Sequence, residues 1–217
     1  NFKDLTDDSD DASMLIQADA GLGGIGASSL GYFYSFDTRR TGLNSNVGYV
    51  FRFGQEFGFG DMQYLKTTAL AAAETKILND DITLRATIEG GYLDYTKGQS
   101  RITDRFFLGS RKMRGFEASG IGPRDLNENL DGTKTNDALG GNSFAVIRLE
   151  AEFPIGLPSE YGITGGAFVD YGSVWDIGRD IPNTPDFATV VSNDFIGRAV
   201  AGLSVFWTTP IGPLRFN

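Results

Sequence analysis

The chain has 217 residues, 41% of them hydrophobic, and a mean hydropathy of −0.17. Its formal net charge of −9 argues against nucleic-acid binding, which needs clustered Lys and Arg at the phosphates. Cys and His are both absent, which excludes disulfides, thiolate nucleophiles, a His general base and zinc sites built on Cys or His. No run reaches the ~18 apolar residues of a membrane helix, but membrane strands alternate in polarity and are not excluded by average hydropathy.

The first residues of the chain are acidic, and residues 1–13 are predicted to form a loop. They include five aspartates, namely Asp4, Asp7, Asp8, Asp10 and Asp11. This run lacks the spacing of an EF-hand, so a solvated loop is the interpretation and no metal site is predicted. Residues 14–18 are a candidate for a short strand, and no segment of the chain predicts a convincing helix.

Alternation of apolar and polar residues with period two then dominates the chain and predicts strands. The predicted strands are residues 30–36, 46–57, 64–75, 82–92, 143–153, 163–172, 198–207 and 213–217. With residues 14–18 this gives roughly nine strands, most of about 10–12 residues, the length that spans a bilayer when a strand is tilted. Soluble strands are usually shorter, about 5–6 residues. The sequence therefore predicts an all-β, antiparallel fold.

The connections between these strands differ in length between the two rims. On one rim, residues 96–141 and 173–196 form two long loops, whereas the four connections on the other rim are short. Short turns on one side and long loops on the other are typical of outer-membrane barrels. The sequence thus favours a transmembrane barrel over a soluble β-sandwich binding module, and partition into detergent would separate the two.

The polar strand faces of such a barrel point into its lumen. They carry six charged residues, namely Arg85, Glu89, Arg148, Glu150, Glu152 and Asp170. One interpretation is a solvated interior, as in a porin. The other is that the loop 96–141 folds back into the lumen and that Arg114 pairs with Glu150 and Asp170, as a latch and not as chemistry. No catalytic motif competes with these two interpretations, so the chain is predicted not to be an enzyme.

Several motifs resemble one known family. Arg105-Phe106-Phe107-Leu108-Gly109, followed by Met113-Arg114-Gly115-Phe116, resembles the loop motif of the BamA branch of the outer-membrane assembly superfamily, the bacterial surface antigen family. Residues 120–125, 138–142, 170–176 and 206–214 are similar to further segments of that family, in the same order. The resemblance covers about residues 27–217 and is closest to alphaproteobacterial members.

The resemblance implies a barrel of sixteen strands in the bacterial outer membrane, preceded by POTRA domains. Members of the family recognise unfolded outer-membrane proteins and insert them, without nucleotide, cofactor or covalent intermediate, and a weak seam between first and last strands templates the client. The implied partners are these clients, outer-membrane lipids, and accessory lipoproteins bound through the POTRA domains. The implied latch consists of Met113, Arg114, Gly115, Phe116, Glu150, Phe168 and Asp170.

The chain departs from the family pattern at both ends. It shows no POTRA domains, no early strands and no closing strand, and about nine strands cannot complete the barrel without open edges in lipid. We therefore expect residues 1–217 to be the C-terminal portion of the barrel domain of a larger protein. A two-partner secretion transporter, or another outer-membrane translocation pore, remains the alternative because it shares the loop arginine. Five POTRA repeats upstream would favour the insertase.

Overall fold

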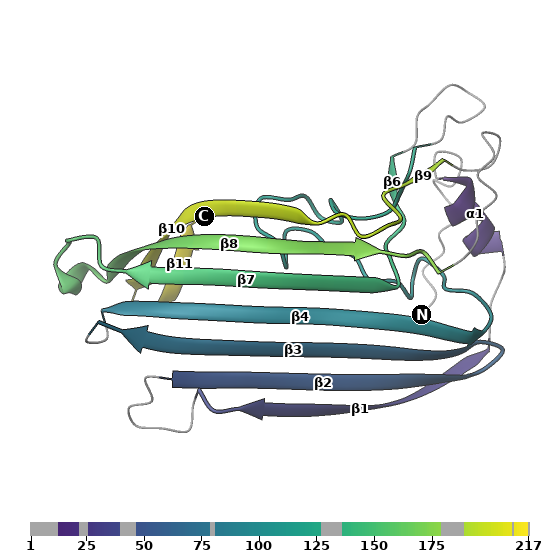
Figure 1. The fold of residues 1–217 in the computed structure, drawn as a ribbon, viewed down its shortest axis with the longest axis horizontal. Coiled ribbons are helices and arrows are strands. Elements are labelled where there is room, and N and C mark those ends of the chain that lie inside the picture. Colours follow the sequence, from purple (N-terminus) through teal and green to yellow (C-terminus); the bar gives the residue numbers. More distant parts are fainter. Residues whose placement is uncertain are drawn as a thin grey trace.

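The computed structural model describes residues 13–21, 26–39, 47–78, 81–126, 136–178, 189–209 and 211–216. The predictions for the acidic residues 1–12 lie outside these ranges. Eight strands form one antiparallel sheet: β1 (Ala27–Asp37), β2 (Val47–Gly60), β3 (Gln63–Ile77), β4 (Ile82–Lys97), β7 (Ser143–Phe153), β8 (Ile163–Trp175), β10 (Arg198–Thr209) and β11 (Gly212–Phe216). They follow one another across the sheet in chain order (Figure 1), which confirms the predicted antiparallel all-β fold.

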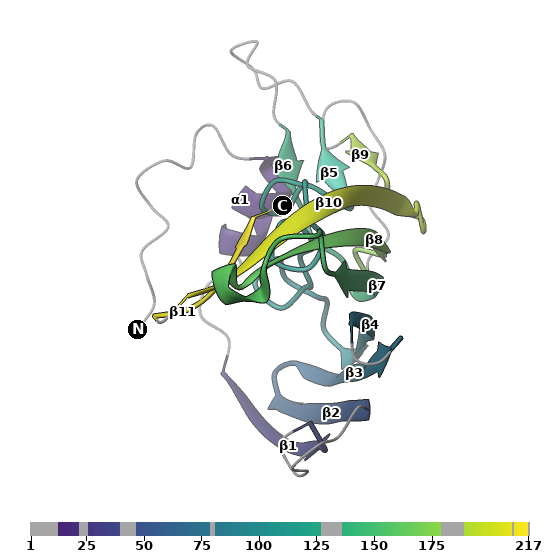
Figure 2. The same cartoon turned by 90° about the vertical axis from the view of Figure 1, so that its left-hand side faces the viewer.

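The sheet is strongly curved and open. Viewed along the strands, β1 to β10 follow an arc, and part of the segment between β4 and β7 lies inside it (Figure 2). β1 and β11 stand at the two ends of the strand order, so the sheet does not close into a barrel. Curvature of this kind is the geometry of a barrel wall, and two packed sheets, as in a sandwich, are not what the described residues form.

The two faces of the sheet differ in character, as the alternation predicted. On the convex face the large apolar side chains are exposed; examples are Leu30, Phe51, Ile88, Leu149 and Leu203. Leu149 is 50% exposed, while the side chain of its neighbour Glu150, on the concave face, is only 9% exposed. An apolar band of this extent fits contact with lipid. In the described part of the chain, no helix is long and apolar enough to cross a membrane.

The first described element differs from the sequence prediction. Residues 14–18, expected to be a strand, belong to helix α1 (Met14–Gly21), so the expectation of no helix was also wrong. The Leu15 N–H donates to the Ser13 Oγ at 3.2 Å, and the Gln17 N–H donates to the Ser13 carbonyl at 3.0 Å. A serine at this position caps a helix, and the Leu and Ala that follow favour one.

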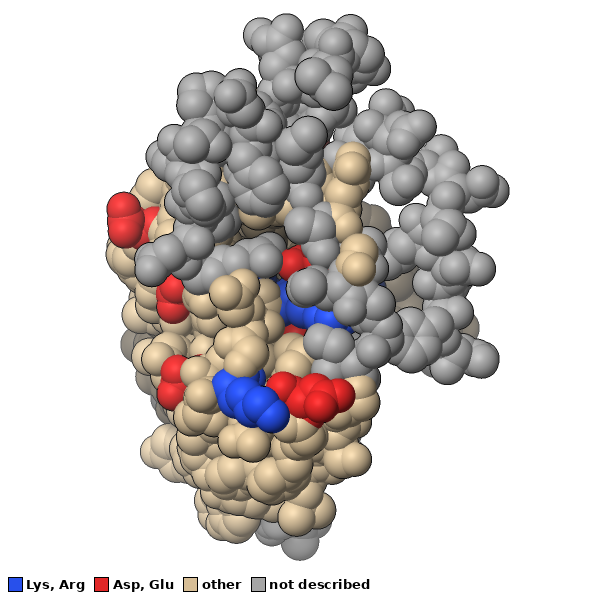
Figure 3. Space-filling model, turned by 90° about the vertical axis from the view of Figure 1, so that its right-hand side faces the viewer, with Lys and Arg blue, Asp and Glu red and all other residues tan. Residues whose placement is uncertain are grey.

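The long connections gather at one end of the sheet, where α1 also lies (Figure 1). Three two-residue strands, β5 (Arg124–Asp125), β6 (Asp137–Ala138) and β9 (Val190–Val191), form a small second sheet there, in the order β6-β5-β9. Leu15, Leu139 and Ile177 form an apolar core beneath it. The opposite end carries short connections, including the 3-10 turn η2 (Ser159–Tyr161). Seen from the end with the long loops, basic and acidic groups lie side by side within a mainly uncharged surface (Figure 3).

Candidate functional site

Part of the segment between β4 and β7 lies on the concave side of the sheet, and backbone contacts close this part at its base. The Phe106 N–H donates to the Gly141 carbonyl at 2.8 Å, and the Gly141 N–H returns a bond of 2.9 Å. One step further on, the Ile121 N–H donates to the Leu108 carbonyl at 3.2 Å. Residues 109–120 therefore form a closed inner loop, which we call the motif loop.

Apolar side chains hold the motif loop against the sheet. Met113 is fully buried in a cluster with Leu108, Ile121, Phe144, Val146 and Val174, and Phe106, Phe116 and Val200 pack around that cluster. Gly172 of β8 lies directly beneath Met113, since a Cβ on Gly172 would stand 3.0 Å from the Met113 Sδ. Met113 and Phe116, which flank Arg114 and Gly115, thus hold the motif loop against the sheet, and they fix where Arg114 contacts the strands.

Arg114 is bound by groups on two adjacent strands. Its backbone N–H and its Nε–H donate to Asp170 Oδ2 at 3.1 and 2.7 Å, and one terminal nitrogen binds Asp170 Oδ1. The other terminal nitrogen donates to Glu150 Oε2 at 2.6 Å. The guanidinium carbon lies 3.7 Å from the centroid of the Phe168 ring, a cation–π distance. The structure therefore brings Arg114 into contact with all three residues that the resemblance implied.

The burial of these groups makes the contacts energetically important. Asp170 is fully buried, and the exposed side-chain fractions of Arg114 and Glu150 are 16% and 9%. Removal of one partner from a buried, hydrogen-bonded charge pair costs about 3–5 kcal/mol, because the other charge is left without compensation. The planar guanidinium binds two carboxylates and a ring at once, which an ammonium group cannot do.

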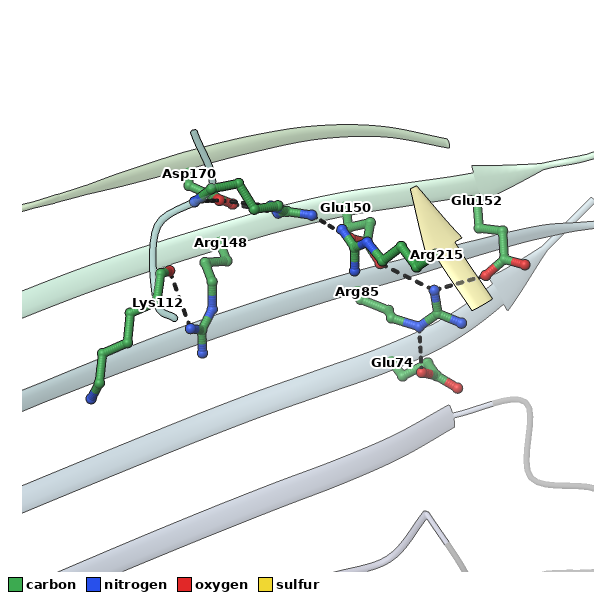
Figure 4. Close-up of polar contacts among 9 residues, drawn as sticks. Glu74, Arg85, Lys112, Arg148, Glu150, Glu152, Asp170 and Arg215 are labelled. Atoms are coloured by element: carbon green, nitrogen blue, oxygen red, sulfur yellow. Dashed lines mark hydrogen bonds and ion pairs between the residues drawn. The ribbon is translucent and has the colours of Figure 1, made fainter. Parts of the chain in front are cut away.

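The ion pairs continue across the concave face beyond Arg114. Glu150 also accepts from Arg85 at 3.2 Å, and Arg85 binds Glu74 and Glu152 at 2.8 Å each (Figure 4). Arg215 of β11 binds Glu150 as well. The network thus reaches from β3 through β4 and β7 to the motif loop, β8 and β11.

A second set of contacts joins the motif loop to β4 and β7. The Lys112 ammonium binds Glu89, and its Nζ lies 4.2 Å from the centroid of the Phe144 ring. Arg148 donates to the Lys112 carbonyl and to Glu89, at 3.3 Å each. The charged residues expected in the lumen are therefore engaged in pairs, and four of them contact the motif loop; these four are Glu89, Arg148, Glu150 and Asp170.

The sequence prediction of the site did not include several contributors. Glu74 and Lys112 were missed, the first because the faces of strand 64–75 are poorly separated in sequence. Arg105 also contributes to the site and was not predicted to do so. It is 5% exposed, and its guanidinium donates to the Ser100 carbonyl at 2.9 Å and to the Leu139 carbonyl at 3.1 Å. It ties together the two ends of the long connection. Its place in the Arg-Phe-Phe-Leu-Gly motif was the sequence feature that could have indicated this role.

The chain resembles known proteins along most of its length. Residues 5–217 match the family model of the Omp85 superfamily domain. The outer membrane protein assembly factor BamA of Neorickettsia risticii is 31% identical over 173 residues, which are 78% of this chain and 21% of that protein. The sorting assembly machinery 50 kDa subunit of Saccharomyces cerevisiae is 33% identical over 121 residues, 53% of this chain and 23% of that protein.

A solved structure shows the same fold. BamA from Haemophilus ducreyi lacking POTRA domains 1–3 superposes with a TM-score of 0.67 at 24% identity, covering 88% of this chain and 37% of that chain. The chain spans roughly a fifth of the length of these two curated relatives: the aligned residues make up 21% of the first protein and 23% of the second. The family match over residues 5–217 agrees with the curved antiparallel sheet and the motif loop on its concave side. The chain therefore belongs to the Omp85 superfamily.

Proposed function

We propose that this chain is the C-terminal part of the barrel of an outer-membrane protein assembly factor. The whole protein folds β-barrel clients and inserts them into the bacterial outer membrane, without covalent chemistry. Relatives that carry the names of assembly proteins support this function over that of a secretion transporter. The single observation that carries this choice is the similarity to those relatives. The hold of Asp170, Glu150 and Phe168 on Arg114 fits the proposal but is also expected of a secretion transporter.

This hold suits an insertase because it stiffens one part of the barrel while another part opens. The motif loop contacts β4, β7, β8 and β10 through ion pairs and the Met113 cluster. These strands then stay in register when the seam elsewhere in the barrel separates. An open strand edge presents unpaired N–H and C=O groups, on which a client strand is templated by β-augmentation. The apolar convex face meets the lipid, where a locally thinned bilayer lowers the barrier to insertion.

The proposed partners follow from this mechanism. Unfolded outer-membrane proteins are the clients, and outer-membrane lipids surround the sheet. Accessory lipoproteins bind through POTRA domains of the whole protein. The mechanism uses hydrogen-bond templating and lipid contact alone, so neither a cofactor nor a covalent intermediate enters it. Among the described residues, no group of Asp and Glu is arranged to hold a metal ion.

Removal of the Arg114 guanidinium tests the proposal in the full-length protein. Arg114→Ala leaves Asp170 buried without a cation, so we expect a destabilisation of about 3–5 kcal/mol, smaller where water enters the lumen. Client folding by the protein in proteoliposomes should slow in parallel. Arg114→Lys should restore part of both, because an ammonium reaches one carboxylate but does not bridge two.

The matched control is Arg111→Ala, since Arg111 is exposed, lies on the same loop and forms no ion pair with the described residues. The full-length protein with Arg111→Ala should fold clients at the normal rate. If Arg114→Ala released the loop and client folding stayed at the normal rate, the proposed link between latch and insertion would be wrong. Normal client folding with defective export of an unfolded passenger would point to a secretion transporter instead.

A further inference from the structure

Glu150 is shared between the motif loop and the last described strand. Its Oε2 atom accepts from the Arg114 guanidinium at 2.6 Å, and the same oxygen accepts from the Arg215 guanidinium of β11. Its other oxygen is taken by Arg85 at 3.2 Å. Figure 4 shows Arg215 reaching Glu150 from the β11 side. Two cations from different elements therefore meet at one carboxylate oxygen whose side chain is 9% exposed.

Two positive charges that bind the same oxygen weaken each other. They share one lone-pair region, and the guanidiniums repel each other across a short distance in a poorly solvated site. The cluster as a whole has three guanidiniums, on Arg85, Arg114 and Arg215, against the four carboxylates of Glu74, Glu150, Glu152 and Asp170. Withdrawal of Arg215 would make this cluster more negative, and its hold on Arg114 would become stronger.

β11 pairs with β10 on one side, from Val205↔Phe216 to Thr209↔Gly212. The Arg215 guanidinium carbon also lies 5.1 Å from the centroid of the Phe206 ring on β10. The contact with Glu150 thus depends on where β11 places Arg215, and a shift of β11 away from β7 removes it.

We propose that Arg215 competes with Arg114 for Glu150, and that it thereby couples the position of β11 to the hold on the motif loop. With β11 seated, Glu150 is shared and the loop is held less tightly. When β11 moves away, Glu150 binds Arg114 alone and the loop is held more tightly. The inference rests on the proposed function, in which strands near the seam move while the wall under the loop stays fixed. Arg215 is a positioning residue in this mechanism, since it acts through Glu150.

Thiol labelling measures the hold on the loop directly. Val146 of β7 is 1% exposed beneath the motif loop, and the chain has no Cys, so Val146→Cys provides a reporter that reacts with maleimide when the loop lifts. The experiment uses the full-length protein in nanodiscs, with any Cys outside this chain replaced by Ser. Arg114→Ala should accelerate labelling. Arg215→Met should slow it by about fivefold, the size of coupling seen between neighbouring charged residues.

Three variants make this result specific. Arg215→Lys keeps a cation at Glu150, so labelling should return towards the normal rate. In a Glu150→Gln background, Arg215→Met should have no further effect, because the shared carboxylate is gone. Arg198→Met is the matched control: Arg198 also faces the lumen from β10 but forms no ion pair with the described residues, and its loss should leave labelling unchanged.

Two outcomes would overturn the inference. If Arg215→Met accelerated labelling, Arg215 would be supporting the latch and not competing with it. If it changed labelling equally with and without Glu150, the effect would be general destabilisation of the sheet. Neither outcome touches the proposed function, which fails separately if the unmodified full-length protein folds no clients in proteoliposomes.

Discussion

Gly115 sets the backbone turn that follows Arg114 in the motif loop. Its φ of 77° lies in the left-handed region, where a side chain with a Cβ is strained. A Cβ there would meet the Val200 Cγ2 at 3.6 Å, an ordinary contact, so the cost of a substitution comes from the backbone alone. Gly115→Ala should therefore destabilise the protein by about 1–2 kcal/mol.

Chemical denaturation of the full-length protein in detergent would measure this cost. Gly115→Asn is the matched variant, because Asn tolerates the left-handed region better than Ala does, and it should retain more of the stability. Equal losses for Ala and Asn would show that the position is limited by space and not by its backbone angle.

At the scale of single residues, part of the site could be predicted from the sequence. Alternation along two strands placed Glu150, Phe168 and Asp170 on one face, and the resemblance paired them with Arg114. Lys112 was not predicted because it lies in the motif loop, which has no strand alternation. Arg215 was not predicted because alternation reports which face a side chain occupies but not its position along the strand. Contacts across several strands depend on the register of the whole sheet, and this is fixed by pairing that the local sequence does not contain.

Asp125 joins three separate elements at the loop end of the molecule. It is fully buried on β5, and it accepts from the Ser13 Oγ–H before α1 at 2.6 Å and from the Thr189 N–H beside β9 at 2.9 Å. Asp125→Asn removes the charge that strengthens both bonds, and it replaces one accepting oxygen by a donor group, so the bond with the Ser13 hydroxyl is lost or must reverse its direction. We expect a cost of about 1–3 kcal/mol and a looser α1.

Hydrogen exchange over residues 14–21 of the full-length protein would report this loosening. Asp94→Asn serves as the control, because Asp94 is an exposed carboxylate on β4. Unchanged exchange in Asp125→Asn would mean that the apolar core of Leu15, Leu139 and Ile177 holds α1 without help from the carboxylate.

At the scale of elements, the long strands were predictable and the short elements were not. Strands such as β4 and β7 are long enough for the alternation of apolar and polar residues to be recognised. The strands β5, β6 and β9 have two residues each, which is too few to show any alternation. They form because the two long loops pair with each other at one end of the main sheet. Helix α1 was misread for a related reason: a short apolar run fits a strand or a helix equally well, and the Ser13 cap decides.

At the scale of the whole molecule, the sheet has the form of a barrel wall with two free edges. Its strands run from 11 to 16 residues except for β11, which has five. The motif loop covers the concave face over β4, β7, β8 and β10, and charged groups of these strands are paired there. The convex face has no such partner within the described residues, and its exposed apolar side chains are suited to hydrocarbon.

This orientation predicts a depth-dependent cost for charge on the convex face. Leu149 lies near the middle of β7 and is 50% exposed, so Leu149→Arg should cost about 2–4 kcal/mol in folding of the full-length protein into lipid vesicles. Ile155 is similarly exposed but follows the end of β7, and Ile155→Arg should cost about 0–1 kcal/mol. Equal, small costs at both positions would mean that the convex face meets water, because only hydrocarbon distinguishes an arginine at mid-height from one at the rim.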